Sequence, residues 1–123
     1  MKGLRLYKIE KLCSETAISR LFARSDREVH TALVYPLRMA WRVDGVREVK
    51  VARFLVSVPK KRLRHAVDRV AMRRRVREAY RLNRDLMPRD LPLDIAFIYV
   101  ADKLLPYSRI ETAMRRLLTE LNS

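Results

Sequence analysis

Several residue types that define common structural classes are scarce in this chain of 123 residues. The single cysteine, Cys13, excludes a disulfide within the chain, and we expect a buried structural thiol. Two glycines and five prolines are too few for a low-complexity chain, and no Gly-rich phosphate loop is present. No run reaches the roughly 18 apolar residues of a membrane span, and the start lacks the apolar stretch of a signal peptide. We therefore expect one cytoplasmic domain over residues 1–123, with no membrane contact.

Negative charge is also scarce. The 28 basic residues exceed the 14 acidic ones, which gives a formal net charge of +14. Because 49% of the residues are hydrophobic, the chain can form a core and is not a disordered basic tail. A domain this basic usually binds a polyanion, either nucleic acid or an anionic membrane surface.

The first half of the chain has the pattern of one helix followed by strands. Ser14 can cap a short helix that runs to about residue 24. From Thr31 to Arg42 apolar residues alternate, which predicts a strand with Pro36 at an edge or a bulge. Asp44-Gly45 is a hairpin signal, and residues 46–58 then form a second extended run that can break into two strands.

The second half predicts helix, strand and helix. A basic loop at 60–65 precedes a long helix from about residue 66 to 84, and residues 93–101 are as apolar as a central strand. In the last helix, Ser108 and Glu111 are spaced as a capping box. The order α-β-β-β-α-β-α predicts an α+β sandwich with one sheet covered by helices. The face expected to pack in the last helix consists of Ile110, Ala113, Met114, Leu117, Leu118 and Leu121.

Most of the net charge lies in residues 60–84, which contain eleven basic side chains against only Asp68 and Glu78. At ~100° per residue the helix separates an arginine side from an apolar side that should face the sheet. A solvated helix usually interleaves charges, and a membrane-surface helix needs a free apolar face, so we favour nucleic acid over both alternatives. The arginine side consists of Arg73, Arg74, Arg77, Arg81 and Arg84, and the apolar side of Met72, Val76, Ala79, Tyr80 and Met87.

The same segment resembles the signature of bacterial ribonuclease P proteins, S-V-S-K-K followed by A-V-x-R-N-R-x-[KR]-R-x-x-R-E-x-[FY]. Order and spacing match from Ser57 to Tyr80, and the flanking elements follow the family order. The chain departs from the signature at Arg69-Val70-Ala71, where the family has R-N-R. Leu55 stands where glycine is usual, and the loop 62–64 is one residue longer.

The resemblance implies a role in removing the 5′ leader of precursor tRNA. The partner RNA would perform the Mg²⁺-dependent hydrolysis, and the protein would be a monomeric accessory subunit in a one-to-one complex, without an organic cofactor. It also implies a left-handed crossover around the long helix. The basic helix and loop would bind the RNA through Lys60, Lys61, Arg62, Arg64, Arg69, Arg73, Arg74, Arg77 and Arg81.

In this family a cleft binds the single-stranded leader, and three of its positions match residues of this chain. Phe22 and Tyr35 match cleft aromatics, and Ile18 stands where an aromatic is common. Stacking on aromatic side chains binds single strands without reading base identity. The alternative is that Phe22 and Tyr35 are ordinary core residues.

Two other functions remain open at this stage. The first is a ribosomal or other structured-RNA-binding protein without a catalytic partner. The second is a protein-only nuclease, because Asp44, Glu48 and Lys50 resemble the D…E-x-K metal-binding triad of nucleases. An exposed hairpin explains those three residues more simply. His30 and His65 are isolated, so we predict neither a protein catalytic residue nor a protein-bound metal.

Overall fold

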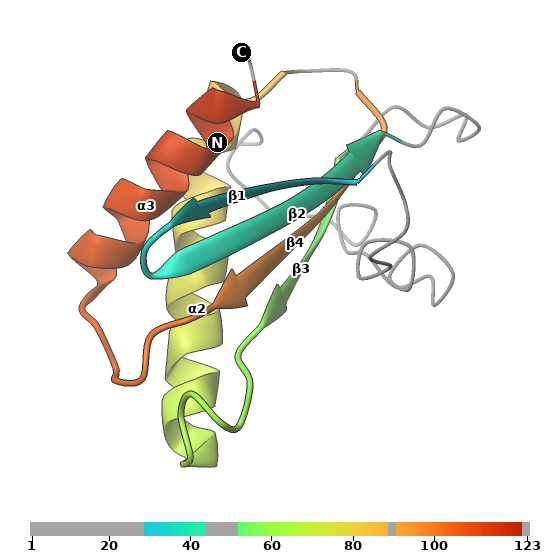
Figure 1. Cartoon of the computed structure of the whole chain (residues 1–123). Coiled ribbons are helices and arrows are strands. Elements are labelled where there is room, and N and C mark those ends of the chain that lie inside the picture. Colours follow the sequence, from blue (N-terminus) through green and yellow to red (C-terminus); the bar gives the residue numbers. More distant parts are fainter. Residues whose placement is uncertain (1–28, 44–51, 89–90, 122–123) are drawn as a thin grey trace.

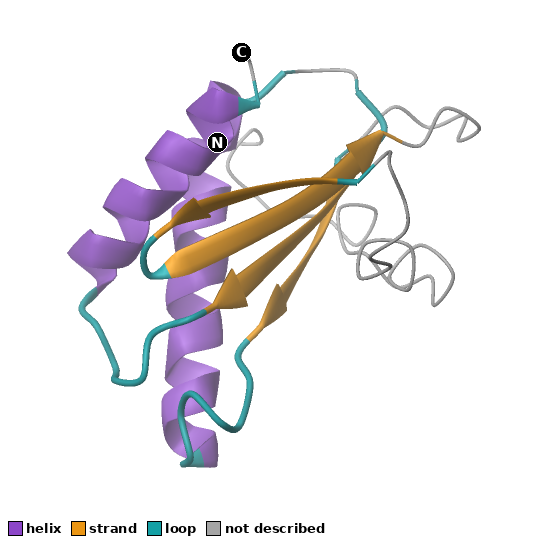
Figure 2. Ribbon diagram, in the orientation of Figure 1, coloured by secondary structure: helices purple, strands orange, loops and turns teal. Residues whose placement is uncertain are grey.

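A computed structural model describes residues 29–43, 52–88 and 91–121. As predicted, strands come first and are followed by a helix, a strand and a helix, although the run predicted as the first strand forms two; the predicted helix at 14–24 lies outside the described residues (Figures 1 and 2). The elements are β1 (His30–Val34), β2 (Leu37–Val43), β3 (Arg53–Ser57), α2 (Ala66–Asn83), the 3-10 helix η3 (Arg84–Leu86), β4 (Leu93–Tyr99) and α3 (Tyr107–Glu120).

The four described strands form one mixed sheet in the order β1-β2-β4-β3. β4 is central, antiparallel to β2 and parallel to β3, and its side chains are almost all buried, as its apolar sequence predicts. Both helices lie on one face of the sheet, where α3 contacts β1 and β2 while α2 contacts β3 (Figure 1). The predicted α+β class is confirmed.

The connection from β3 through α2 to β4 is a left-handed crossover. In Figure 1 both strands run downwards, α2 lies behind the sheet, and β4 lies to the left of β3. Parallel strands are nearly always joined by a right-handed crossover, so this handedness is a distinctive property of the fold.

The core lies between the sheet and the two helices. Phe54 of β3 stacks on Tyr80 of α2, with 4.2 Å between ring centroids, and Phe97 of β4 lies 5.7 Å from Tyr80 and 6.5 Å from Phe54. Stacked and edge-to-face rings at such distances stabilise a core beyond the burial of their area. This aromatic cluster fixes the rotation of α2 against the sheet, and therefore which residues of the helix face solvent.

The first strand differs from its prediction. The chain reverses at Tyr35-Pro36, whose peptide bond is cis, so the expected single strand is the hairpin β1–β2. Pro36 has no N–H to donate to a ladder, and it lies in the turn rather than at a bulge or strand edge. The reversal shifts the alternation by one residue, since Val34 pairs with Leu37 and both face the core side. The predicted turn at Asp44-Gly45 lies outside the described residues.

The helices match their predicted ranges more closely. α2 ends at Asn83, and η3 continues the chain to Leu86. α3 buries the predicted residues from Ile110 to Leu118, with Leu121 partly buried. The predicted capping box is wrong, because the helix begins at Tyr107 with Pro106 as its cap residue and no side-chain cap bond. This start places Ser108 inside the first turn.

Candidate nucleic-acid interface

The buried side of α2 determines where its arginines lie. Met72, Val76, Ala79, Tyr80 and Asn83 are all buried, which turns the opposite side of the helix outwards. Four of the five predicted arginines lie on α2, and Arg84 begins η3 directly after it. Arg74 and Arg77 are exposed, and the other three are partly buried. We call this surface the arginine face: Arg73, Arg74, Arg77, Arg81 and Arg84.

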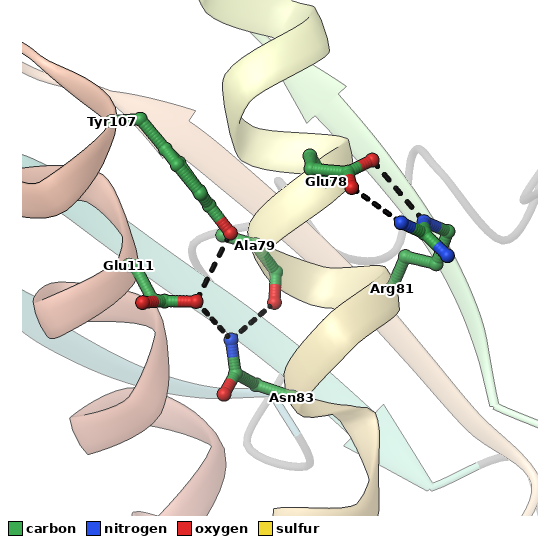
Figure 3. Close-up of polar contacts among 6 residues, drawn as sticks. All are labelled: Glu78, Ala79, Arg81, Asn83, Tyr107 and Glu111. Carbon is green, nitrogen blue, oxygen red and sulfur yellow. Dashed lines mark hydrogen bonds and ion pairs between the residues drawn. The ribbon is translucent and has the colours of Figure 1, made fainter. Parts of the chain in front are cut away.

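The arginine face contains little compensating negative charge. Glu78 and Arg81, one helical turn apart, form an ion pair that keeps the pKa of the Glu78 carboxyl below its usual value through the Arg81 hydrogen bond (Figure 3). Within the described segments, Arg73, Arg74 and Arg77 form no ion pair. Like charges repel across this face, and a polyanion can neutralise them.

The basic loop, residues 60–65, is anchored at its centre. The amides of Arg62 and Leu63 donate to the Pro59 carbonyl at 3.0 and 3.3 Å, and the Leu63 side chain is only 5% exposed. Lys60, Lys61 and Arg64 are exposed around that anchor. A loop fixed in this way presents its cations in a defined arrangement, with little ordering entropy left to lose on binding.

Besides Arg81, two further predicted RNA-binding residues have partners within the protein. Arg69 Nη1 donates to the carbonyls of Leu63 at 3.0 Å and Arg64 at 2.9 Å, so this guanidinium holds the loop against the first turn of α2. Arg62 Nη1 lies 3.1 Å from Asp102 Oδ1 in an ion pair. Both residues thus position the basic loop as well as adding charge to it.

The residues that depart from the family signature lie on different sides of α2. Val70 is 40% exposed and lies beside the arginine face by helical phase, whereas Ala71 is partly buried and lies off that face. The arginine face therefore loses one polar side chain at residue 70 and no charge.

Only one of the three predicted leader-cleft residues falls in the described part of the chain. Tyr35 lies in the β1–β2 turn and is 53% exposed, so the alternative that it is a core residue is wrong. Near this turn, Leu33 of β1 and Arg38 of β2 are exposed as well. Ile18 and Phe22 lie outside the described residues.

A polar network joins the C-terminal half of α2 to α3 (Figure 3). Buried Asn83 donates through Nδ2 to the Ala79 carbonyl at 2.8 Å and to Glu111 Oε2 at 3.2 Å. Its Oδ1 accepts from Arg115 Nη1 at 3.0 Å, and Glu111 Oε2 accepts from the Tyr107 hydroxyl at 3.0 Å. Glu111 thus serves this network rather than the predicted capping box. These hydrogen bonds hold α2, the helix that carries most of the arginine face, against α3.

Tyr107 makes this network sensitive to high pH. Burial first, and then the Glu111 carboxylate, raise the pKa of the Tyr107 hydroxyl to about 12. Since an unfolded tyrosine ionises near pH 10, this group's contribution to stability is complete below about pH 10 and is lost as the pH rises towards 12. We expect Tyr107→Phe to lose less stability than the unchanged protein between about pH 9.5 and 11.5 in urea unfolding. Equal losses in both proteins would contradict this role of the hydroxyl.

A metal site and a membrane-spanning helix each place requirements on the described residues. No group of three or more His, Cys, Asp or Glu within them is placed to hold a metal ion. None of the helices in the described ranges is long and apolar enough to cross a membrane. Asp44, Glu48 and Lys50 of the nuclease hypothesis fall in a segment outside these ranges.

Solved structures define the class of this fold. The ribonuclease P protein of Thermotoga maritima superposes with a TM-score of 0.71 at 21% identity, covering 90% of this chain and 96% of that one. The Staphylococcus aureus ribonuclease P protein gives 0.71 at 17% identity, covering 93% and 95%. The mixed sheet and its helices are thus those of ribonuclease P proteins.

Sequence relatives extend this likeness from fold to family. The ribonuclease P protein component of Porphyromonas gingivalis is 38% identical over 121 residues, covering 94% of this chain and 85% of the relative. That of Chlorobaculum tepidum is 32% identical over 120 residues, covering 89% and 77%. The sequence model of the family Ribonuclease P matches residues 6–122. This chain belongs to the ribonuclease P protein family, whose members are components of an endoribonuclease that processes tRNA.

Proposed function

We propose that the arginine face and the basic loop bind the ribonuclease P RNA. The observation that carries this proposal is the unpaired state of Arg73, Arg74 and Arg77 within the described residues, on a helix held rigidly by the core. A guanidinium can contact phosphate with two parallel hydrogen bonds and can also stack on a base. The proposed contact residues are Lys60, Lys61, Arg62, Arg64, Arg69, Arg73, Arg74, Arg77 and Arg81.

We assign the hydrolysis to the RNA rather than to protein side chains. The Mg²⁺ ions that assist phosphodiester hydrolysis would be held on that RNA. This chain's contribution is to neutralise backbone charge and to orient the substrate, as one protein per RNA. Family membership makes a structured-RNA-binding protein without a catalytic partner the weaker alternative.

We further propose that Tyr35 contacts the single-stranded leader of precursor tRNA, with Ile18 and Phe22 as its predicted neighbours. Support for Tyr35 comes from its exposure, 53%, at a turn fixed between two paired strands. A side chain that is both exposed and held in place offers a ring for stacking at low entropic cost.

The leader contact predicts a substrate-selective loss. We expect Tyr35→Ala to weaken binding of leader-containing precursor tRNA to the reconstituted complex about tenfold, since stacking contributes ~1–3 kcal/mol per base. Binding of mature tRNA, which has no leader, should be unchanged. Tyr35→Phe keeps the ring and should bind both tRNAs as the unchanged protein does. An equal loss for precursor and mature tRNA would remove Tyr35 from the leader site.

A further inference from the structure

The loop between β4 and α3, residues 100–106, is held by hydrogen bonds to three other parts of the fold: β4, α2 and the β1–β2 turn. The Tyr99 hydroxyl donates to the Lys103 carbonyl at 2.5 Å and accepts from the Leu105 amide at 3.3 Å. Arg75 Nη1 donates to the Leu105 carbonyl at 2.6 Å. The Val100 amide donates to the Pro36 carbonyl at 2.9 Å. These bonds, with buried Ala101 and Leu105, leave the loop one defined conformation.

The ion pair between Arg62 and Asp102 joins this loop to the basic loop. The two residues are 40 positions apart in sequence, and their side chains meet at 3.1 Å. Both loops lie at the end of the molecule where α2 begins (Figure 1). The bridge offsets the charge of Arg62 with that of Asp102, so the net positive charge at the junction comes from the neighbours of this pair.

Lys103 lies beside this ion pair and is not among the RNA-contact residues proposed above. It is exposed, it follows Asp102 directly, and it has no ion-pair partner within the described residues. Its backbone carbonyl is fixed by Tyr99, whereas its side chain extends into solvent. On the basic loop, Lys60, Lys61 and Arg64 are likewise exposed and without such a partner in the described part of the chain.

We propose that the basic loop and the loop at 100–106 form one phosphate-binding surface at this end of the molecule, and that Lys103 contacts RNA phosphate there. The surface rests on the proposed function and extends it beyond the signature segment at 57–80. Arg75, Tyr99 and the Arg62–Asp102 pair position its two halves. A lysine ammonium suits this role, because it contacts phosphate as a compact charge without a fixed hydrogen-bond geometry.

The salt dependence of RNA binding tests Lys103 directly. If Lys103 contacts a phosphate, Lys103→Gln should flatten the slope of log K against log salt for the cognate ribonuclease P RNA by about 0.7–0.9. Arg116→Gln is the matched control. It also removes one exposed charge, but from the groove between α3 and β1, and its slope should equal that of the unchanged protein.

The outcomes separate this inference from the proposed function. An unchanged slope for Lys103→Gln, or an equal decrease for Arg116→Gln, overturns the surface assigned to Lys103. If Arg77→Gln then still flattens the slope, the proposed function stands without this extension. Both variants should unfold at the same temperature as the unchanged protein. With equal thermal stability, a change in slope reports a change in binding and not in folding.

Discussion

Replacement of Arg73, Arg74 and Arg77 together by glutamine is expected to weaken binding to the ribonuclease P RNA by roughly 100-fold at 0.15 M salt. Each lost phosphate contact removes about 0.7–0.9 from the slope of log K against log salt, so three contacts remove about 2–3. The effect should be this large because none of the three guanidinium groups has an ion-pair partner within the described residues. No described acidic side chain therefore offsets their charge, which can act on phosphate.

The triple lysine variant at the same positions is the matched control. It keeps three positive charges while it removes the planar guanidinium groups, so its slope should stay close to that of the unchanged protein. Its affinity should fall less than that of the glutamine variant. A glutamine variant with an unchanged slope would contradict the placement of the RNA on the arginine face.

Phe97→Ala is expected to destabilise the fold by about 3–5 kcal/mol, as large-to-small changes of buried aromatics do. Phe97 is fully buried on the central strand and contacts both Phe54 and Tyr80. Loss of its ring opens a cavity between β4 and α2, the helix that carries most of the arginine face. Since a domain is stabilised by only about 5–15 kcal/mol, this is a large fraction of the total.

Urea unfolding measures this effect through the midpoint and the slope of the transition. Phe97→Leu refills part of the cavity and should lose clearly less stability than Phe97→Ala. A loss below about 1 kcal/mol for Phe97→Ala would show that the aromatic cluster does not hold α2 to the sheet.

Periodicity predicted the elements whose pattern is unambiguous. The arginine and apolar sides of α2, and the packed face of α3, follow from spacing at ~100° per residue. The β1–β2 hairpin was missed because residues 32–35 are all apolar, so the sequence does not show the change of phase that the two-residue turn introduces. A single strand would place Leu33 on the same face as Leu37, whereas the register pairs Leu33 with exposed Arg38.

Contacts between distant segments were beyond the sequence pattern. Asn83 has no feature that distinguishes it from a surface residue at a helix end, and its burial follows only from the packing of α2 on α3. The pairing of Arg62 with Asp102 likewise depends on how two loops meet. For this reason composition and motif located the candidate interface, but they did not separate positioning arginines such as Arg69 from those available to RNA.

The central claim is that this chain assists a catalytic RNA and does not itself cleave. Its most direct test mixes the purified protein with the cognate ribonuclease P RNA at low Mg²⁺ and follows cleavage of a precursor tRNA. We predict that the RNA alone is slow under these conditions, that the protein alone is inactive, and that the mixture releases the 5′ leader at the mature end. Cleavage by the protein alone, or no acceleration of the RNA by the protein, would contradict the account.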